Sequence, residues 1–245
     1  MYLQGFSETC LVSKSLAESL EQTFERCRDM DASLSERLQA LADAVRRLSP
    51  PFAATVDRLI SRLQQSDAGA TAPQLGDPMP PFLLPDEQGH LVGLADLLDH
   101  GPVAVTFHRG HWCPYCRINT DALVKAQKDI ALEGGRVVAV MPDRQQFATE
   151  FKSELRAPFP ILTDIDNGYA LSLNLAIWVG EEMERFISAA GWDVPKFQGN
   201  DSWILPIPAT FVVGKDGHVK ARFVDPDYRK RMAIEDVLAA LRRAR

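Results

Sequence analysis

Cysteine is scarce in this 245-residue chain, which contains only four. A disulfide-stapled scaffold has many more cysteines in a much shorter chain, so that class of protein is excluded. Long apolar runs are missing as well, and no stretch approaches the roughly 20 residues of a membrane-spanning helix. The chain must therefore fold around its own hydrophobic core, and its 46% content of hydrophobic residues is sufficient for one.

An excess of positive charge is also missing. The formal net charge is −6 at pH 7, and the basic residues are scattered along the chain. We therefore expect neither a nucleic-acid-binding surface nor a basic face for membranes. The first twenty residues carry Glu8, Lys14 and Glu18 and have no apolar core of the signal-peptide kind. We expect a cytoplasmic, reducing location.

The N-terminal part carries the signals of amphipathic helices. Ser15 and Glu18 have the spacing of a capping box, and Ser33 and Glu36 repeat it. Apolar residues then recur at helical intervals, and prolines separate the last two segments. Residues 15–65 are therefore predicted to form a helical hairpin or three helices.

A small, polar, proline-bearing stretch at residues 66–74 is typical of a linker. It divides a helical extension with its linker, residues 1–73, from a main domain, residues 74–245. The apolar stripes of the extension must be covered by the main domain or by a second copy of the chain. We expect them to contribute to a homodimer.

The main domain alternates buried strands with helices. Residues 102–107 and 136–141 are apolar runs of strand length, and each precedes a helical pattern, at residues 114–132 and 145–155. Two such units in succession indicate a parallel strand pair with a right-handed crossover. The sequence therefore predicts an α/β fold.

A pair of cysteines follows the first of these strands. Pro114 is suited to the first position of a helix, which places Cys113 at the helix N-terminus and Cys116 one turn further. Their spacing puts both sulfurs on one side of the helix, where they can exchange a disulfide. The free N–H groups and the positive end of the helix dipole favour a thiolate there. This pattern is typical of a redox site, and the loop residues Arg109 and His111 are placed to lower a cysteine pKa.

A Cys-x-x-Cys pair is also half of a zinc site, and His108 and His111 are close in sequence. The chain has no second Cys-x-x-Cys or His-x3-His pattern to complete the site. We therefore favour redox chemistry and expect neither metal nor cofactor. His108 is expected to be a packed or hydrogen-bonded residue at the strand end, and Cys10 and Cys27 to be incidental or packed.

Residues 74–243 resemble the peroxiredoxin-like branch of the thioredoxin superfamily, which includes alkyl hydroperoxide reductase and thiol-specific antioxidant proteins. Four segments carry the resemblance: Gly76-Asp-Pro-Met-Pro-Pro-Phe82, Phe107-His-Arg-Gly-His-Trp-Cys-Pro-Tyr-Cys116, Phe159-Pro-Ile-Leu-Thr-Asp164 and Pro208-Ala-Thr-Phe-Val-Val-Gly-Lys-Asp-Gly217. The resemblance implies a thioredoxin-like fold with a mixed central sheet flanked by helices. It places the cysteine helix at the C-terminal edge of that sheet.

The chain departs from peroxiredoxins at three supporting positions. Those enzymes have a proline seven residues and a threonine three residues before the peroxidatic cysteine, and an arginine on a later strand. If Cys116 is the peroxidatic residue, Arg109, Cys113 and Pro208 occupy these places. The motif instead resembles the thioredoxin and glutaredoxin dithiol, and Pro208 matches the proline that those proteins hold in cis beside their cysteines. The resemblance implies three substrate-contacting residues: Trp112, Tyr115 and Pro208.

Two enzymatic functions and one non-enzymatic function fit these residues. As a peroxidase, the chain would reduce hydrogen peroxide or organic hydroperoxides at Cys116, form a disulfide with Cys113, and be regenerated by thioredoxin or glutathione. As a thiol-disulfide oxidoreductase, it would attack a disulfide with Cys113. The third function is a dithiol-bearing interaction protein. We favour the peroxidase, with Cys116 attacking and Arg109 binding the peroxide oxygens.

Overall fold

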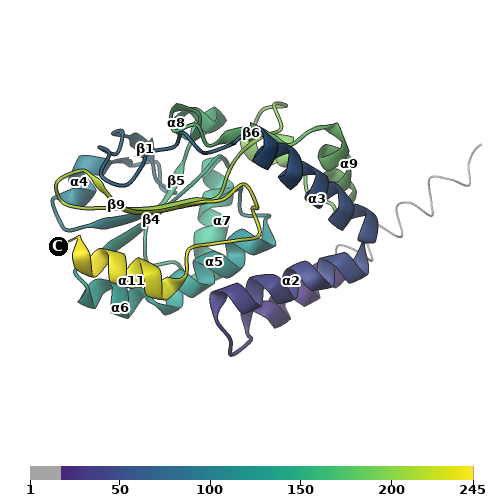
Figure 1. Cartoon of the computed structure of the whole chain (residues 1–245), viewed down its shortest axis with the longest axis horizontal. Helices are drawn as coiled ribbons and strands as arrows, with labels where there is room; N and C mark the ends of the chain where they lie inside the picture. Colours follow the sequence, from purple (N-terminus) through teal and green to yellow (C-terminus); the bar gives the residue numbers. More distant parts are fainter. Residues whose placement is uncertain (1–17, 245) are drawn as a thin grey trace, which may run out of the picture.

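The computed structural model describes residues 18–244, and its centre is a five-stranded mixed sheet (Figure 1). The strand order is β5-β4-β3-β8-β9, in which β3, β4 and β5 run parallel, and β8 pairs antiparallel with both β3 and β9. The strands are β3 (Val103–Phe107), β4 (Arg136–Met141), β5 (Ile161–Thr163), β8 (Ala209–Val213) and β9 (Val219–Val224). This arrangement confirms the predicted α/β fold with a mixed central sheet.

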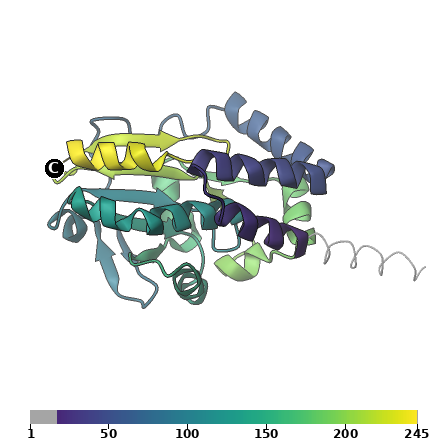
Figure 2. The same cartoon turned by 90° about the horizontal axis from the view of Figure 1, so that it is seen from below.

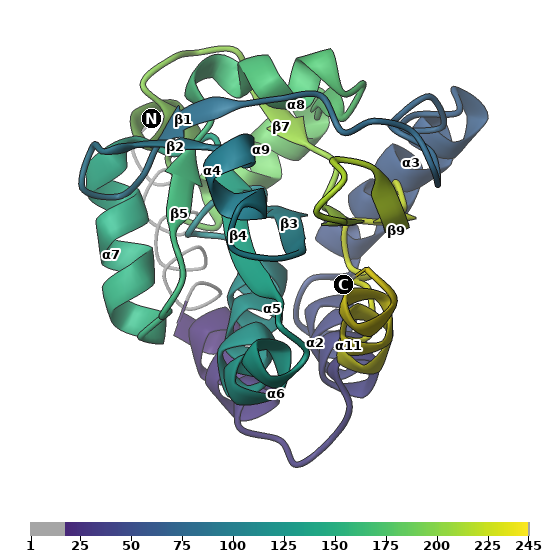
Figure 3. The ribbon, with the colours of Figure 1, turned by 90° about the vertical axis from the view of Figure 1, so that its left-hand side faces the viewer.

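Helices cover both faces of the sheet (Figure 3). One face packs against α4 (Leu94–Leu98) and α8 (Gly168–Ser172). The other packs against four helices: α5 (Pro114–Lys125), α6 (Gln127–Leu132), α7 (Gln145–Leu155) and α11 (Ile234–Arg243). Every residue of β3 is buried, because this central strand has helices on both sides.

The helix predicted over residues 114–132 is divided in two. The expectation of one continuous helix was wrong, because α5 ends at Lys125, α6 begins at Gln127, and Ala126 between them caps both helices. Ala126 and Ile130 are buried in the core on this face of the sheet. No glycine or proline marks the break in the sequence.

Two short hairpins and three short helical segments complete the main domain. The hairpins are β1 (Leu83–Pro85) with β2 (Leu91–Gly93), and β6 (Ala176–Trp178) with β7 (Ile204–Pro206). The helical segments are η1 (Ile165–Asn167), α9 (Glu181–Ala189) and α10 (Val194–Gln198). The connection between β6 and β7 contains α9 and α10, so this long segment has its own secondary structure.

The N-terminal extension packs on the main domain within the same chain. It consists of a helix at residues 18–28, α2 (Leu34–Leu48) and α3 (Pro50–Gln65). The predicted capping box of Ser33 and Glu36 is present, whereas Ser15 and Cys10 lie outside the described residues. Figure 2 shows these helices against the end of the molecule where α5 begins.

The apolar stripes of the extension share one hydrophobic cluster with the cysteine helix. Phe24, Leu41 and Val56 belong to the same buried cluster as Cys113 and Ile118. A buried ion pair joins the two parts, because Arg37 of α2 lies 2.6 Å from Asp121 of α5. The apolar stripes are therefore covered by the main domain of the same chain. They no longer support the expected homodimer, which stays a prediction. Across the described residues no helix is long and apolar enough to span a membrane.

Candidate active site

The cysteine pair lies where β3 ends and α5 begins. Cys113 is the N-cap residue of α5, and Pro114 occupies its first turn, as the sequence predicts. The intervening loop turns at Gly110, whose φ of +144° and close neighbours leave no room for a side chain. This turn brings the backbone of Arg109 over the first turn of the helix, where its N–H group donates to the Cys116 sulfur at 3.3 Å.

Both cysteines are buried free thiols, but their surroundings differ. Cys113 is 1% exposed and lines a pocket, whereas Cys116 is 0% exposed and lies behind it. The Cys116 sulfur also accepts a hydrogen bond of 3.2 Å from the guanidinium of Arg231. A substrate that enters the pocket therefore meets Cys113 first.

The electrostatic environment favours a thiolate at Cys113. Burial raises its pKa. A hydrogen bond from the Cys116 thiol and the positive charges of Arg109 and Arg231 outweigh burial and lower that pKa from 9.0 to about 6. Burial and the neighbouring Cys113 sulfur raise the pKa of Cys116 to about 12. The first proton therefore leaves Cys113, the sulfur that faces the pocket.

Arg231 is a site residue that the sequence did not reveal. It lies in the segment between β9 and α11, 115 positions after Cys116. The residue is 9% exposed, and its guanidinium is held by the carbonyl oxygens of Tyr228 and Lys230, each at 2.6 Å. It stands in a run of three basic residues, 229–231, and nothing in the sequence distinguishes the one that turns inward.

Arg109 is one of the expected site residues, and the structure places its side chain beside the cysteines. The guanidinium lies over the ring of Tyr228 at 3.9 Å and near the ring of Trp112 at 5.2 Å. The whole residue is 4% exposed, and its positive charge lowers the pKa of Cys113. The expected effect of Arg109 on a cysteine pKa is therefore present.

His111 pairs with the carboxylate of Asp143, not with a cysteine as expected. Its Nδ1 atom lies 2.7 Å from a carboxylate oxygen of Asp143, and its backbone N–H donates to the same oxygen at 2.6 Å. Its ring stacks on Phe147 with centroids 4.9 Å apart. The charges that lower the pKa of Cys113 come from arginines. Asp143 is fully buried, was missed in the sequence, and fixes the loop through His111.

His108 and Cys27 are packed residues, as predicted. His108 is 0% exposed, and its Nε2 atom lies 3.0 Å from the Thr106 hydroxyl oxygen. Cys27 is 5% exposed within the cluster of the N-terminal helices. Among residues 18–244, no three His, Cys, Asp or Glu side chains are arranged to hold a metal ion.

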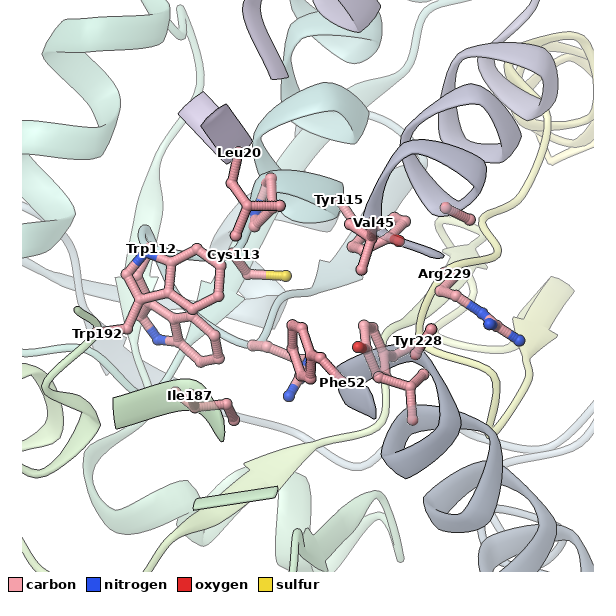
Figure 4. Close-up of a pocket in the computed structure, with 15 residues that line it drawn as sticks. Leu20, Val45, Phe52, Trp112, Cys113, Tyr115, Ile187, Trp192, Tyr228 and Arg229 are labelled. Carbon is pink, nitrogen blue, oxygen red and sulfur yellow. The ribbon is translucent and has the colours of Figure 1, made fainter. Parts of the chain in front are cut away.

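The pocket in front of Cys113 is narrow and mostly apolar (Figure 4). Its cavity volume is about 30 Å³, and its walls come from both the extension and the main domain. Trp112 and Tyr115 line it, and their contact with a substrate stays a prediction. The N-terminal helices contribute Leu20, Val45 and Phe52.

Pro208 is placed differently from the expectation. It lines a separate small cavity that also contacts Arg109 and Tyr228. No peptide bond in the described part of the chain is cis, so the expected cis bond before Pro208 is absent. The expectation of a cis bond was therefore wrong, and Ile207, the residue before Pro208, donates its backbone N–H to the Leu175 carbonyl oxygen at 2.7 Å.

A family model described as "AhpC/TSA family" matches residues 75–222. Among curated proteins, none matches the chain. Solved structures with the same fold include the peroxidoxin BcpB from Mycobacterium tuberculosis, with 22% identity, a TM-score of 0.55, and coverage of 71% of this chain and 99% of that one. The peroxiredoxin 6 of Arenicola marina, in a mutant form, has 16% identity, a TM-score of 0.55, and coverage of 69% and 71%. A yeast mitochondrial 1-Cys peroxiredoxin has 15% identity, a TM-score of 0.52, and coverage of 67% and 73%.

Proposed function

Since this chain belongs to the AhpC/TSA family, we propose that it is a dithiol peroxidase in which Cys113 attacks the peroxide and Cys116 resolves the product. One observation carries the proposal. The sulfur with the lowered pKa, Cys113, is also the sulfur that lines the pocket, whereas Cys116 lies behind it. This order reverses the one expected from the alignment of Cys116 with the peroxidatic position.

The first step is attack of the Cys113 thiolate on the outer oxygen of a hydroperoxide. The O–O bond breaks, Cys113 becomes a sulfenic acid, and the remaining alkoxide or hydroxide takes a proton from solvent. Loss of the Cys113 negative charge removes a main cause of the high pKa of Cys116. Arg231 and the N–H of Arg109 then stabilise a Cys116 thiolate.

In the second step, the Cys116 thiolate attacks the sulfenic sulfur of Cys113. A disulfide forms, and the hydroxyl group of the sulfenic acid leaves as water after protonation. Two reducing equivalents from thioredoxin or glutathione then restore both thiols.

The pocket favours a small substrate. Cys113 is 1% exposed beneath the N-terminal helices, so a disulfide in a folded protein has no access in this conformation. The –OOH end of hydrogen peroxide or of an organic hydroperoxide fits the narrow space. The order of the two pKa values is also that of a thiol-disulfide oxidoreductase, so the reduction of small disulfides is the second candidate function.

Stopped-flow oxidation of the reduced protein tests the proposal, with hydrogen peroxide, cumene hydroperoxide and a small disulfide, oxidised glutathione, as oxidants. Cys116→Ser should form a trappable sulfenic acid at Cys113 and overoxidise, whereas Cys113→Ser should consume no peroxide above background. Cys27→Ser is the matched control and should behave as wild type. Mass mapping of oxidised wild type should show a disulfide between Cys113 and Cys116.

A sulfenic acid at Cys116 in the Cys113→Ser protein would restore the order expected from the sequence. Reduction of disulfides without peroxide consumption would give first place to the oxidoreductase. Absence of both reactions would favour the interaction protein.

A further inference from the structure

Two buried positive charges flank the cysteines without a carboxylate partner. Arg109 is 4% exposed and Arg231 is 9% exposed. Within residues 18–244, neither guanidinium has a carboxylate at ion-pair distance. Their contacts are aromatic rings, carbonyl oxygens and the Cys116 sulfur.

The carboxylates of this region are already committed to other groups. Asp143 accepts from the backbone and ring of His111. Asp227 pairs with Arg229 at 2.8 Å. Arg109 and Arg231 are therefore left with the sulfur pair as their anionic counterpart.

A buried charge without a counter-ion is costly, because the protein interior replaces its hydration poorly. In the reduced protein the sulfur pair carries one negative charge, shared through the hydrogen bond between the two cysteines. Arg231 contacts one of these sulfurs, and Arg109 acts electrostatically on the other. In the reduced state, the negative charge of the sulfur pair therefore offsets part of the positive charge of the two guanidiniums.

Oxidation removes this negative charge. The Cys113 thiolate and the Cys116 thiol lose two electrons and one proton and become a neutral disulfide. Both guanidiniums then remain buried with no anion beside them. A disulfide whose reduced form is preferentially stabilised is a strong oxidant.

We infer that Arg109 and Arg231 make the Cys113–Cys116 disulfide strongly oxidising, so that a small monothiol of the glutathione class is a sufficient reductant. The incoming thiolate attacks the Cys113 sulfur and releases the Cys116 thiolate beside Arg231. A second thiolate attacks the mixed disulfide, releases the Cys113 thiolate, and leaves as the oxidised dimer of the monothiol. The inference rests on the dithiol part of the proposed function and on no particular peroxide.

Equilibration in glutathione redox buffers, with thiols counted by mass spectrometry after acid quenching, measures this property. Arg231→Met and Arg109→Met should each shift the equilibrium toward the disulfide by about tenfold or more, since each removes one charge. A tenfold shift corresponds to about 30 mV for this two-electron couple. Arg231→Lys keeps the charge and should stay nearer wild type than Arg231→Met.

The matched control is Arg243→Met, which removes an exposed arginine on α11, far from the sulfurs in sequence. It should leave the equilibrium unchanged. Equilibria within twofold of wild type for both Arg109→Met and Arg231→Met would overturn the inference.

A second measurement needs no variant at these positions. By linkage, a folded protein that favours the reduced state is less stable when oxidised, whereas an ordinary disulfide stabilises the protein that contains it. The oxidised wild type should therefore unfold at a lower temperature than the reduced wild type. A higher unfolding temperature for the oxidised protein would overturn the inference. Neither measurement uses peroxide, so failure of the peroxidase proposal is detected separately.

Discussion

The Nη2 atom of Arg231 lies 3.2 Å from the Cys116 sulfur, although 115 positions separate the two residues in the sequence. The contact forms because the segment after β9 returns to the start of α5. Within that segment, the carbonyl oxygens of Tyr228 and Lys230 hold the Arg231 guanidinium in place. In the proposed mechanism, a guanidinium in this place stabilises the resolving thiolate at Cys116.

Arg231→Met should slow the resolving step by about tenfold, because the Cys116 thiolate loses its charged hydrogen-bond donor. The sulfenic acid at Cys113 should live longer, and overoxidation at high peroxide should increase. Stopped-flow fluorescence can separate this step from the peroxide step. A resolving rate equal to that of the Arg243→Met control would contradict the assigned contact.

Alkylation of Cys113 should follow a thiolate that forms near pH 6, since its pKa is lowered to about 6. The rate should rise as pH increases through that value and level off by neutral pH, because only the thiolate reacts. Arg109→Met should move the midpoint upward, since it removes a positive charge that lowers the pKa. Mass spectrometry of iodoacetamide-labelled protein gives the rate at Cys113. A midpoint near pH 9 in wild type would be inconsistent with the described environment.

Asp121→Asn should lower the free energy of unfolding by about 3 kcal/mol, because it leaves Arg37 buried without its carboxylate. The side chain of Arg37 is 5% exposed, and its ion pair joins α2 to the cysteine helix. Glu182→Gln is the matched control, since it removes an exposed ion pair with Arg58. The Glu182 side chain is 49% exposed and that of Arg58 is 58% exposed. That control should cost less than about 1 kcal/mol. Urea unfolding measures the free energy of unfolding of both variants. An equal decrease in the two would argue against a stabilising role of the buried Arg37–Asp121 ion pair.

Gly110→Ala should lower both stability and peroxide turnover. An added Cβ would lie 2.4 Å from Nε1 of Trp112 and 2.8 Å from Oδ1 of Asp143, at a φ of +144°. Overpacking and backbone strain together should cost about 3 kcal/mol and displace the loop that carries Arg109. Gly217→Ala has a φ of +76° but no atom within 4 Å of the new Cβ. This control should cost about 1 kcal/mol and leave turnover unchanged. Thermal unfolding and stopped-flow assays measure both effects, and similar losses for the two variants would show that crowding at Gly110 is unimportant.

The sequence alone predicted the elements that depend on local pattern. The strand Arg136–Met141 and the helix Gln145–Leu155 have the predicted bounds, because apolar periodicity decides which face of a segment is buried. The position of Cys113 at a helix start also follows from the chain itself, through the proline that comes next. The resemblance to a redox family depends on the same short motifs.

The tertiary structure decided which sulfur is activated. Cys113 and Cys116 are equivalent candidates in the sequence, and only their surroundings separate them. Arg231 comes from a segment more than a hundred residues away in the sequence. The helices of the extension cover Cys113, but its side chain still lines a pocket. Electrostatic effects on a pKa depend on distances across the fold and on burial, and neither is written in the spacing of residues along the chain. The sequence thus determined that a dithiol stands at the start of a helix, and the packing of distant segments determined its chemistry.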